Sequence, residues 1–130
     1  MKKILLDTNA YSEFCRGNIK VLEEIISADI IYFSVIVKAE LITGFIRGSR
    51  EKYNREILNK FLAKPTITIH EITEDTVEYF AQIKTCLVKS GNPIPINDVW
   101  IAAESLETKS TLITFDNHFR FIPDLDLSIL

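Results

Sequence analysis

The stretch Pro95-Ile-Asn-Asp-Val-Trp-Ile-Ala-Ala-Glu-Ser-Leu106 predicts a helix that carries an acid at its beginning. Proline disfavours helix before it, and Asn97 or Asp98 is a favourable N-cap for the helix that follows. At the 3.6-residue period, Asp98 shares a face with apolar or small residues, namely Ile101, Ala102 and Ser105. Asp98 is therefore either a simple helix cap or a carboxylate held above an inward-facing stripe, and the rest of the chain decides between them.

The composition is that of an ordinary globular protein. The 130 residues are 47% hydrophobic and 25% charged, which is enough for a single domain, residues 1–130, with a substantial core. No apolar run approaches the ~20 residues of a membrane span, and Asp7 ends the first apolar run too early for a signal peptide. Cys15 and Cys86 lack the spacing of a zinc site or a disulfide framework. We expect both to be reduced core residues of a cytoplasmic protein.

Short apolar runs alternate with segments of helical period. The runs predict strands at Lys3–Leu6, Ile30–Phe33, Thr66–Ile69, Thr111–Thr114 and Leu125–Leu130. The segments between them predict helices from Ala10 to Gly17, over Ile19–Ala28, from a Ser34 cap to Ile46, over Glu51–Leu62, from Thr73 to Ser90, and at Asp98. This alternation predicts an α/β fold of three layers, α/β/α, around a short central parallel sheet.

Acids stand where predicted strands end or helices begin. Asp7 follows the first strand, Asp116 follows the strand Thr111–Thr114, and Asp98 begins the helix that leads into that strand. Glu40 lies in the helix after the second strand, on a face with apolar and small residues, namely Ile36, Val37, Thr43 and Gly44. Because ligands bind beyond the carboxyl ends of the strands in open α/β sheets, we expect the four acids to gather at one edge.

Each acid also has a purely structural explanation. Asp7 with Asn9, and Asp116 with the asparagine after it, fit simple turns, while Glu40 fits a surface acid paired with a lysine. Together, however, such carboxylates would raise one another's pKa unless a cation neutralised them, and all-oxygen ligands suit Mg²⁺ or Mn²⁺. His118 is the only nearby imidazole, and we expect it to anchor a loop or contact substrate rather than ligate metal.

The charge of the chain is unevenly distributed. A net charge of −3 does not predict nucleic-acid binding. Between Gly44 and Lys64, however, six basic residues face only two acids; the basic residues are Arg47, Arg50, Lys52, Arg55, Lys60 and Lys64. Such a run is typical of a solvated helix face, and a phosphodiesterase would use it to hold the backbone of its substrate. Arg47, Arg50 and Arg55 are the candidate substrate contacts.

Four ordered motifs resemble the PIN domain, in particular the VapC toxins of toxin–antitoxin pairs. They are Ile4-Leu-Leu-Asp-Thr-Asn9, Val37-Lys-Ala-Glu-Leu41 with Gly44, Asn97-Asp-Val-Trp-Ile-Ala-Ala103 and Thr114-Phe-Asp-Asn-His-Phe119, and they span essentially the whole chain. The resemblance implies an acidic quartet of Asp7, Glu40, Asp98 and Asp116, supported by the polar residues Asn9 and Thr114. It implies a Mg²⁺- or Mn²⁺-dependent endoribonuclease that cuts a structured RNA. Asp7, Asp98 and Asp116 would hold the metal, and Glu40 would be a further ligand or would orient the attacking water.

The same resemblance implies two protein partners, a second copy of the chain and an antitoxin. The early helices carry more apolar residues than a core obviously absorbs, namely Tyr11, Phe14, Val21, Leu22, Ile25 and Phe45. A leftover apolar patch usually marks an interface. We therefore expect a disordered antitoxin segment to lie along these helices and to place an Arg or Lys near Asp7 and Asp98.

Two other functions stay open at this point. A haloacid-dehalogenase-like phosphatase also uses an Asp after the first strand, but it requires a second Asp two residues later, where this chain has Asn9. The second alternative is a catalytically silent PIN-like module that acts only through its partner. The intact acidic quartet argues against it.

Overall fold

The computed structural model describes all 130 residues and contains a single five-stranded sheet. The strands are β1 (Lys3–Leu6), β2 (Ile30–Ser34), β3 (Ile67–His70), β4 (Thr111–Thr114) and β5 (Leu127–Ile129). They lie in the order β3-β2-β1-β4-β5, and every neighbouring pair is parallel. The predicted parallel sheet is therefore confirmed.

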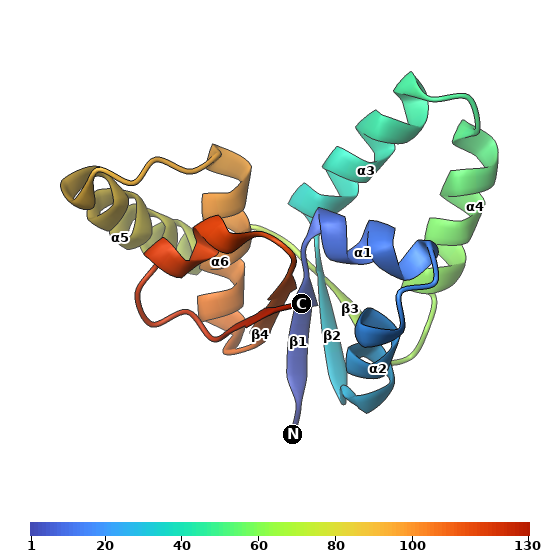
Figure 1. Cartoon of the computed structure of the whole chain (residues 1–130), viewed down its shortest axis with the longest axis horizontal. Helices are drawn as coiled ribbons and strands as arrows, with labels where there is room; N and C mark the ends of the chain where they lie inside the picture. The colour runs from blue at the N-terminus through green and yellow to red at the C-terminus, as the bar shows by residue number, and fades with distance from the viewer.

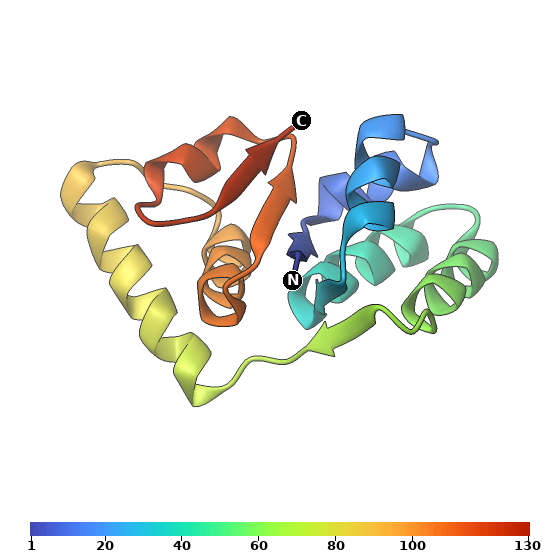
Figure 2. The same cartoon turned by 90° about the horizontal axis from the view of Figure 1, so that it is seen from below.

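Six α-helices and one short 3-10 helix surround the sheet. They are α1 (Thr8–Cys15), α2 (Ile19–Ser27), α3 (Val35–Arg47), α4 (Glu51–Leu62), α5 (Glu74–Ser90), α6 (Ile96–Thr108) and the 3-10 helix η1 (Asn117–Phe121). Helices α5 and α6 lie on one side, and α1, α2 and the α3–α4 hairpin lie on the other (Figures 1 and 2). This arrangement confirms the three layers. None of the helices combines the length and the apolar character that a membrane crossing requires.

The core lies on both faces of the central strands. Parallel strands covered by helices on each face read as continuous apolar runs, and the fully buried strand residues are Ile4, Leu5, Leu6, Ile31, Phe33, Leu112 and Ile113. On one face the Tyr11 ring packs edge-on against Phe33 and Phe61, with centroid distances of 5.7 Å and 5.3 Å. These aromatic contacts hold α1 and α4 against β2.

The strand order changes direction between β1 and β4. From β1 the chain steps outward to β2 and β3, and it then returns to the other side of β1 with β4 and β5. The register pairs Leu6 with Ile113, so Asp7 and Thr114 follow at the same level. Ser34 pairs with His70 at the ends of β2 and β3. The carboxyl ends of four strands therefore lie along one edge, with the switch in strand order at β1 and β4.

Several boundaries differ from those expected. Helix α1 begins at Thr8, before Ala10, because the Asp7 side chain caps it. The prediction that Asn97 or Asp98 caps α6 was wrong: Pro95 occupies the N-cap position without a side-chain hydrogen bond, and its carbonyl accepts from the Asp98 backbone N–H at 3.0 Å. Asp98 therefore lies inside the first turn. Strand β3 extends to His70, β5 is shorter than expected, and η1 was not predicted.

Candidate active site at the carboxyl edge of the sheet

Asp7 joins the first strand, the first helix and the end of β4. Its side chain is 5% exposed. One carboxylate oxygen, Oδ1, accepts from the Ala10 backbone N–H at 2.7 Å, and Oδ2 accepts from the Thr114 hydroxyl. Burial raises the pKa of Asp7 to about 6; the two hydrogen bonds oppose the shift, and the charges of Asp98 and Asp116 add to it. Asp7 is therefore a buried acid that faces two others.

Asp98 and Asp116 meet across the imidazole of His118. The Nε2 atom of His118 lies 2.8 Å from Asp98 Oδ2, and Nδ1 lies 3.1 Å from Asp116 Oδ1. Burial raises the pKa of Asp98, His118 opposes the shift, and the charges of Glu40 and Asp116 add to it. His118 thus anchors the η1 segment between two acids.

Glu40 reaches the same edge from α3. The Thr8 hydroxyl donates to Glu40 Oε1 at 2.7 Å, which ties α3 to the start of α1, one residue after Asp7. One turn further along α3, the space beside the Cα of Gly44 is open, because a Cβ there would meet nothing within 4 Å. Glu40 therefore lies next to an open stretch of α3. Sequence reasoning missed Thr8, since its contact with Glu40 spans 32 residues.

The structure brings the four predicted acids to one edge, but it does not bring every predicted residue there. Asn9 is exposed, and its side chain forms no hydrogen bond with the acids. The predicted basic residues lie at the far end of the α3–α4 hairpin. Arg50 stacks on the Tyr53 ring at 4.1 Å, Arg55 pairs with Glu51 at 2.9 Å, and Arg47 is exposed in the last turn of α3.

The donor set of this edge fits a hard divalent cation. Ligand atoms of Asp98, Asp116 and His118 lie within 4.8 Å of one another, and Asp7 faces the same place. No Lys or Arg forms an ion pair with any of the four acids. Converging carboxylates without basic partners are the ligands that Mg²⁺ and Mn²⁺ prefer. The edge is therefore a candidate metal centre.

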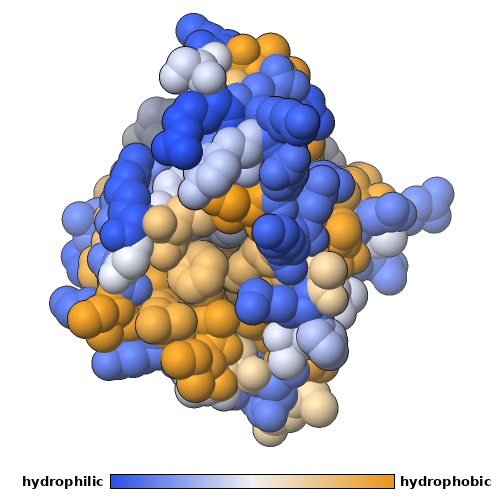
Figure 3. All heavy atoms as spheres, turned by 90° about the vertical axis from the view of Figure 1, so that its right-hand side faces the viewer, coloured by the Kyte–Doolittle hydropathy of each residue, from blue (hydrophilic) through white to orange (hydrophobic).

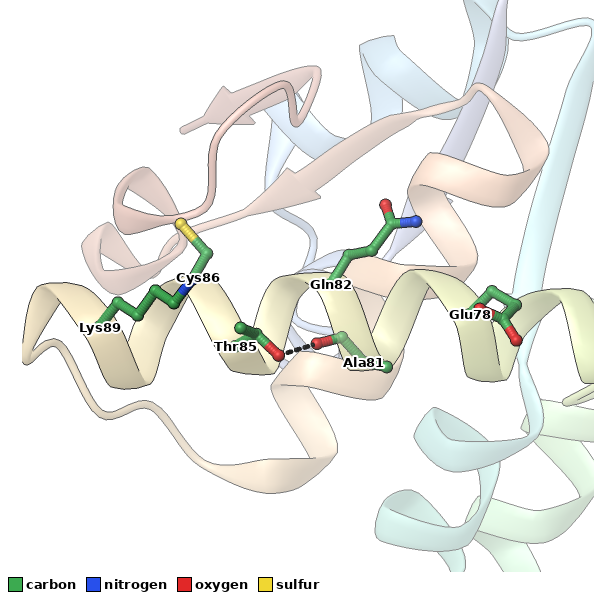
Figure 4. A pocket seen from close by; sticks show the side chains of 6 residues that line it. All are labelled: Glu78, Ala81, Gln82, Thr85, Cys86 and Lys89. Atoms are coloured by element: carbon green, nitrogen blue, oxygen red, sulfur yellow. Dashed lines mark hydrogen bonds between the residues drawn. The ribbon is translucent and has the colours of Figure 1, made fainter.

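A separate hollow of about 520 Å³ lies along the surface of α5. Figure 4 shows that all six of its lining residues belong to that helix. They include one acid, Glu78, and one base, Lys89, but none of the four acids at the sheet edge. Because its side chains do not converge from different elements, this hollow has no chemistry comparable with that of the edge.

The helices opposite α5 and α6 form a second surface feature, which we call the α1–α4 groove. It has a volume of about 380 Å³ and is lined by residues of α1, α3 and α4 and the loop before α4, including Tyr11, Cys15, Leu41, Phe45 and Tyr53. Below it, α2 exposes Ile19, Leu22 and Ile26, which are 68%, 40% and 73% exposed. Figure 3 shows apolar side chains gathered towards the lower part of this face.

The core absorbs some of the apolar residues of the early helices, and one expectation about this region was wrong. Tyr11 and Val21 are 2% and 0% exposed because α1 and α2 turn them onto the sheet. Cys15 was expected in the core, but it is exposed at the end of α1; Cys86 is partly buried in α5, and both thiols are free. The apolar surface is therefore carried by the outer face of α2.

Comparison with known proteins places this geometry in a family. Residues 4–125 match the PIN domain. Ribonuclease VapC1 of Haemophilus influenzae (strain R2866) is 31% identical over 126 residues, which cover 93% of this chain and 92% of the relative. Ribonuclease VapC2 of Rickettsia felis is 29% identical over 128 residues, which cover 95% of this chain and 94% of the relative. The structure of VapBC2 from Rickettsia felis, bound to a DNA fragment from their promoter, matches with a TM-score of 0.86 at 27% identity over 98% of each chain. The chain therefore belongs to the PIN-domain family and, within it, to the VapC ribonucleases.

Proposed function

We propose that this protein is a Mg²⁺- or Mn²⁺-dependent endoribonuclease and the toxin of a toxin–antitoxin pair. The observation that carries the proposal is the convergence of Asp7, Asp98 and Asp116 at the switch in strand order, without a Lys or Arg partner. The names of its relatives, Ribonuclease VapC1 and VapC2, supply RNA as the substrate class. The substrate we propose is a structured RNA of the cytoplasm.

In this proposal Asp7, Asp98 and Asp116 would bind the cation, and hydrogen bonds from neighbouring residues position these aspartates. When bound, the ion supplies Lewis acidity, which lowers the pKa of a water molecule and offsets charge that develops on the phosphate. Thr114 donates to Asp7 and accepts from the Asp116 backbone N–H at 3.0 Å, so one hydroxyl fixes the spacing of two acids. Glu40, held by Thr8, would ligate the ion or orient the attacking water.

RNA cleavage with and without a chelator is the direct test. Purified protein is incubated with mixed structured RNAs in Mg²⁺, in Mn²⁺ and in EDTA, beside an Asp98→Asn variant. Asp75→Asn is the matched control, because Asp75 is an exposed acid in the first turn of α5. We expect wild type and Asp75→Asn to cut internally in either metal, and EDTA or Asp98→Asn to stop cleavage. An inactive wild type that still binds its partner would instead support the silent PIN-like module.

We further propose that an antitoxin segment occupies the α1–α4 groove and the exposed face of α2, and that the chain forms a homodimer. The exposed isoleucines of α2 support an apolar partner segment. The acidic edge, which lacks Lys or Arg, supports a basic residue on that segment, since Arg pairs bidentately with carboxylates.

Co-expression with the neighbouring small reading frame tests the partner proposal. We expect a stable complex that is inactive until the partner is removed. Replacing Ile19 and Ile26 by Ser should weaken the complex, whereas replacing Val77 and Val88, which are exposed on α5, should leave the antitoxin bound. A non-toxic monomer that captures no such partner would leave the nuclease proposal standing and remove the toxin proposal.

A further inference from the structure

A second polar cluster lies beside the candidate active site, and it is built around Glu104. This acid of α6 is 0% exposed. Its Oε1 accepts from the Ser34 hydroxyl at 2.5 Å, and its Oε2 lies 2.6 Å from Nδ1 of His70. Nothing in the packing of α6 against the sheet requires a carboxylate, and burying one costs several kcal/mol unless its oxygens are satisfied. Here both oxygens are satisfied.

The partners of Glu104 lie at the ends of neighbouring strands. Ser34 is the last residue of β2, and its hydroxyl oxygen also caps α3 by accepting from the Ile36 backbone N–H at 3.0 Å. His70 is the last residue of β3 and pairs with Ser34 in the sheet register. One side chain of α6 therefore contacts the ends of two strands and the residue that begins α3.

The elements that Glu104 joins are those that carry two of the acids. Helix α6 carries Asp98 in its first turn, and α3 carries Glu40. The two helices also contact each other directly, so a shift of one against the other changes the spacing of these two acids. The contact between Glu104 and Ser34 is a direct link between α6 and the beginning of α3.

We propose that Glu104, through Ser34 and His70, is a positioning residue that sets the spacing between Asp98 and Glu40 for cation binding. The inference rests on the proposed metal site, and it assigns Glu104 no contact with the ion or with RNA. A residue that only filled the core would be replaceable by an apolar side chain of similar volume without any effect on the metal.

Three variants separate positioning from packing. Glu104→Met keeps the volume and removes both contacts, whereas Glu104→Gln keeps an acceptor for Ser34 and a polar partner for His70. Glu107→Met is the matched control: Glu107 lies three residues later on α6, 3.4 Å from His70 Nε2, and accepts from the Thr76 hydroxyl, but it has no contact with Ser34. All three changes remove a carboxylate from the same helix.

The readouts are Mn²⁺ affinity by calorimetry and the Mn²⁺ dependence of RNA cleavage. We expect Glu104→Met to weaken Mn²⁺ binding about 10-fold, the size typical of residues that orient metal ligands. Cleavage by this variant should recover at saturating Mn²⁺, and Glu104→Gln and Glu107→Met should bind Mn²⁺ as wild type does. Should Glu104→Met not fold, Ser34→Gly removes the same link while leaving a tolerated N-cap, and the same loss of affinity is expected.

Wild-type Mn²⁺ affinity in Glu104→Met, or in Ser34→Gly where that variant replaces it, would overturn the positioning role and leave the metal site intact. Equal losses in Glu104→Met and Glu107→Met would also overturn it, since the effect would then reflect general loosening of α6. A wild-type protein that binds no Mn²⁺ would overturn the metal site itself, and the positioning role with it.

Discussion

Two polar clusters, each with one buried acid, sit at the same edge of the sheet, and the two acids, Asp7 and Glu104, are satisfied in different ways. One carboxylate oxygen of Glu104 contacts the Ser34 hydroxyl, and the other contacts the His70 imidazole. Asp7 also accepts two hydrogen bonds, but its charged neighbours are Asp98 and Asp116. Burial raises the pKa of both Asp7 and Glu104. Glu104 therefore has an imidazole among its partners, whereas the charged neighbours of Asp7 are acids only.

The comparison teaches that burial of a carboxylate does not by itself identify a functional site. What distinguishes Asp7 from Glu104 is the set of charges around each carboxylate. The charged neighbours of Asp7 are two acids, Asp98 and Asp116, whereas Glu104 has the imidazole of His70 as well as the acid Glu107. Acids that surround another acid store repulsion that binding can release. The two clusters should therefore respond in opposite directions when a carboxylate is removed.

The largest expected effect is on catalysis. Replacing Asp7 or Asp98 by Asn should lower RNA cleavage about 100- to 1000-fold, the range found when an electrostatic group at a reacting centre is lost. In metal-free buffer the same changes should raise the melting temperature slightly, because one member of a repelling cluster is neutralised. Single-turnover cleavage and thermal melting in EDTA measure the two effects. Active mutants, together with a wild type that Mg²⁺ does not stabilise, would disprove the metal site.

Removing Glu104 should have the opposite effect on stability. Glu104→Ala leaves Ser34 and His70 without their buried partner, and breaking a buried pair in this way typically costs about 3 to 5 kcal/mol. Urea denaturation in EDTA provides the free energy of unfolding. A variant as stable as Asp7→Asn would show that the two clusters do not differ in the way described.

The third prediction concerns pH. The ordinary pKa of Asp7 is 3.8 and burial raises it to about 6, so between these values the folded protein holds a proton that the unfolded chain releases. Metal-free stability should therefore fall as pH rises from 4 to 6, by up to about 3 kcal/mol at 1.36 kcal/mol per pKa unit.

The pH dependence has an internal control. Asp7→Asn should flatten the curve, and saturating Mg²⁺ should restore stability above pH 6. Unfolding free energies measured across this range, with and without Mg²⁺, test both statements. A slope that survives in Asp7→Asn unchanged would assign the titration to another group.

The smallest expected effect comes from the basic hairpin, which touches neither cluster. Reversing the charge of Arg47, Arg50 and Arg55 together should weaken RNA binding and make the salt slope shallower by about 2, as expected for three lost phosphate contacts on a single strand. Mn²⁺ affinity should not change. Binding measured at several salt concentrations checks this, and an unaltered slope would mean that the three arginines only solvate the surface.

Much of the acidic edge could be predicted from local pattern. Asp7 and Asp116 follow apolar runs short enough to be buried strands, and the ends of parallel strands share an edge. The capping of α6 was misassigned because favourable N-cap residues follow Pro95, and local propensity does not reveal that its carbonyl already begins the helix. The backbone, not the side chain of Asp98, completes that turn.

The Glu104 cluster could not be predicted in the same way. Its contacts with Ser34 and His70 span 70 and 34 residues, and each partner is unremarkable in its own segment. One local signal existed: Glu104 stands among the buried residues Ile101, Ala102 and Ser105 of α6, where an acid requires a partner. Identifying that partner required the register of β2 and β3.

The double role of Asp7 has a consequence for regulation. Its Oδ1 caps α1 through Ala10, and the next residue, Tyr11, lines the α1–α4 groove. A ligand in the groove and an ion at the acidic edge therefore act on opposite ends of one short rigid connection. Thermodynamic linkage makes such effects mutual: the factor by which a groove ligand lowers ion affinity is the factor by which the ion lowers the affinity of that ligand. With the ion and the antitoxin bound as proposed, Mg²⁺ would set how firmly the antitoxin is held, as well as how fast RNA is cut.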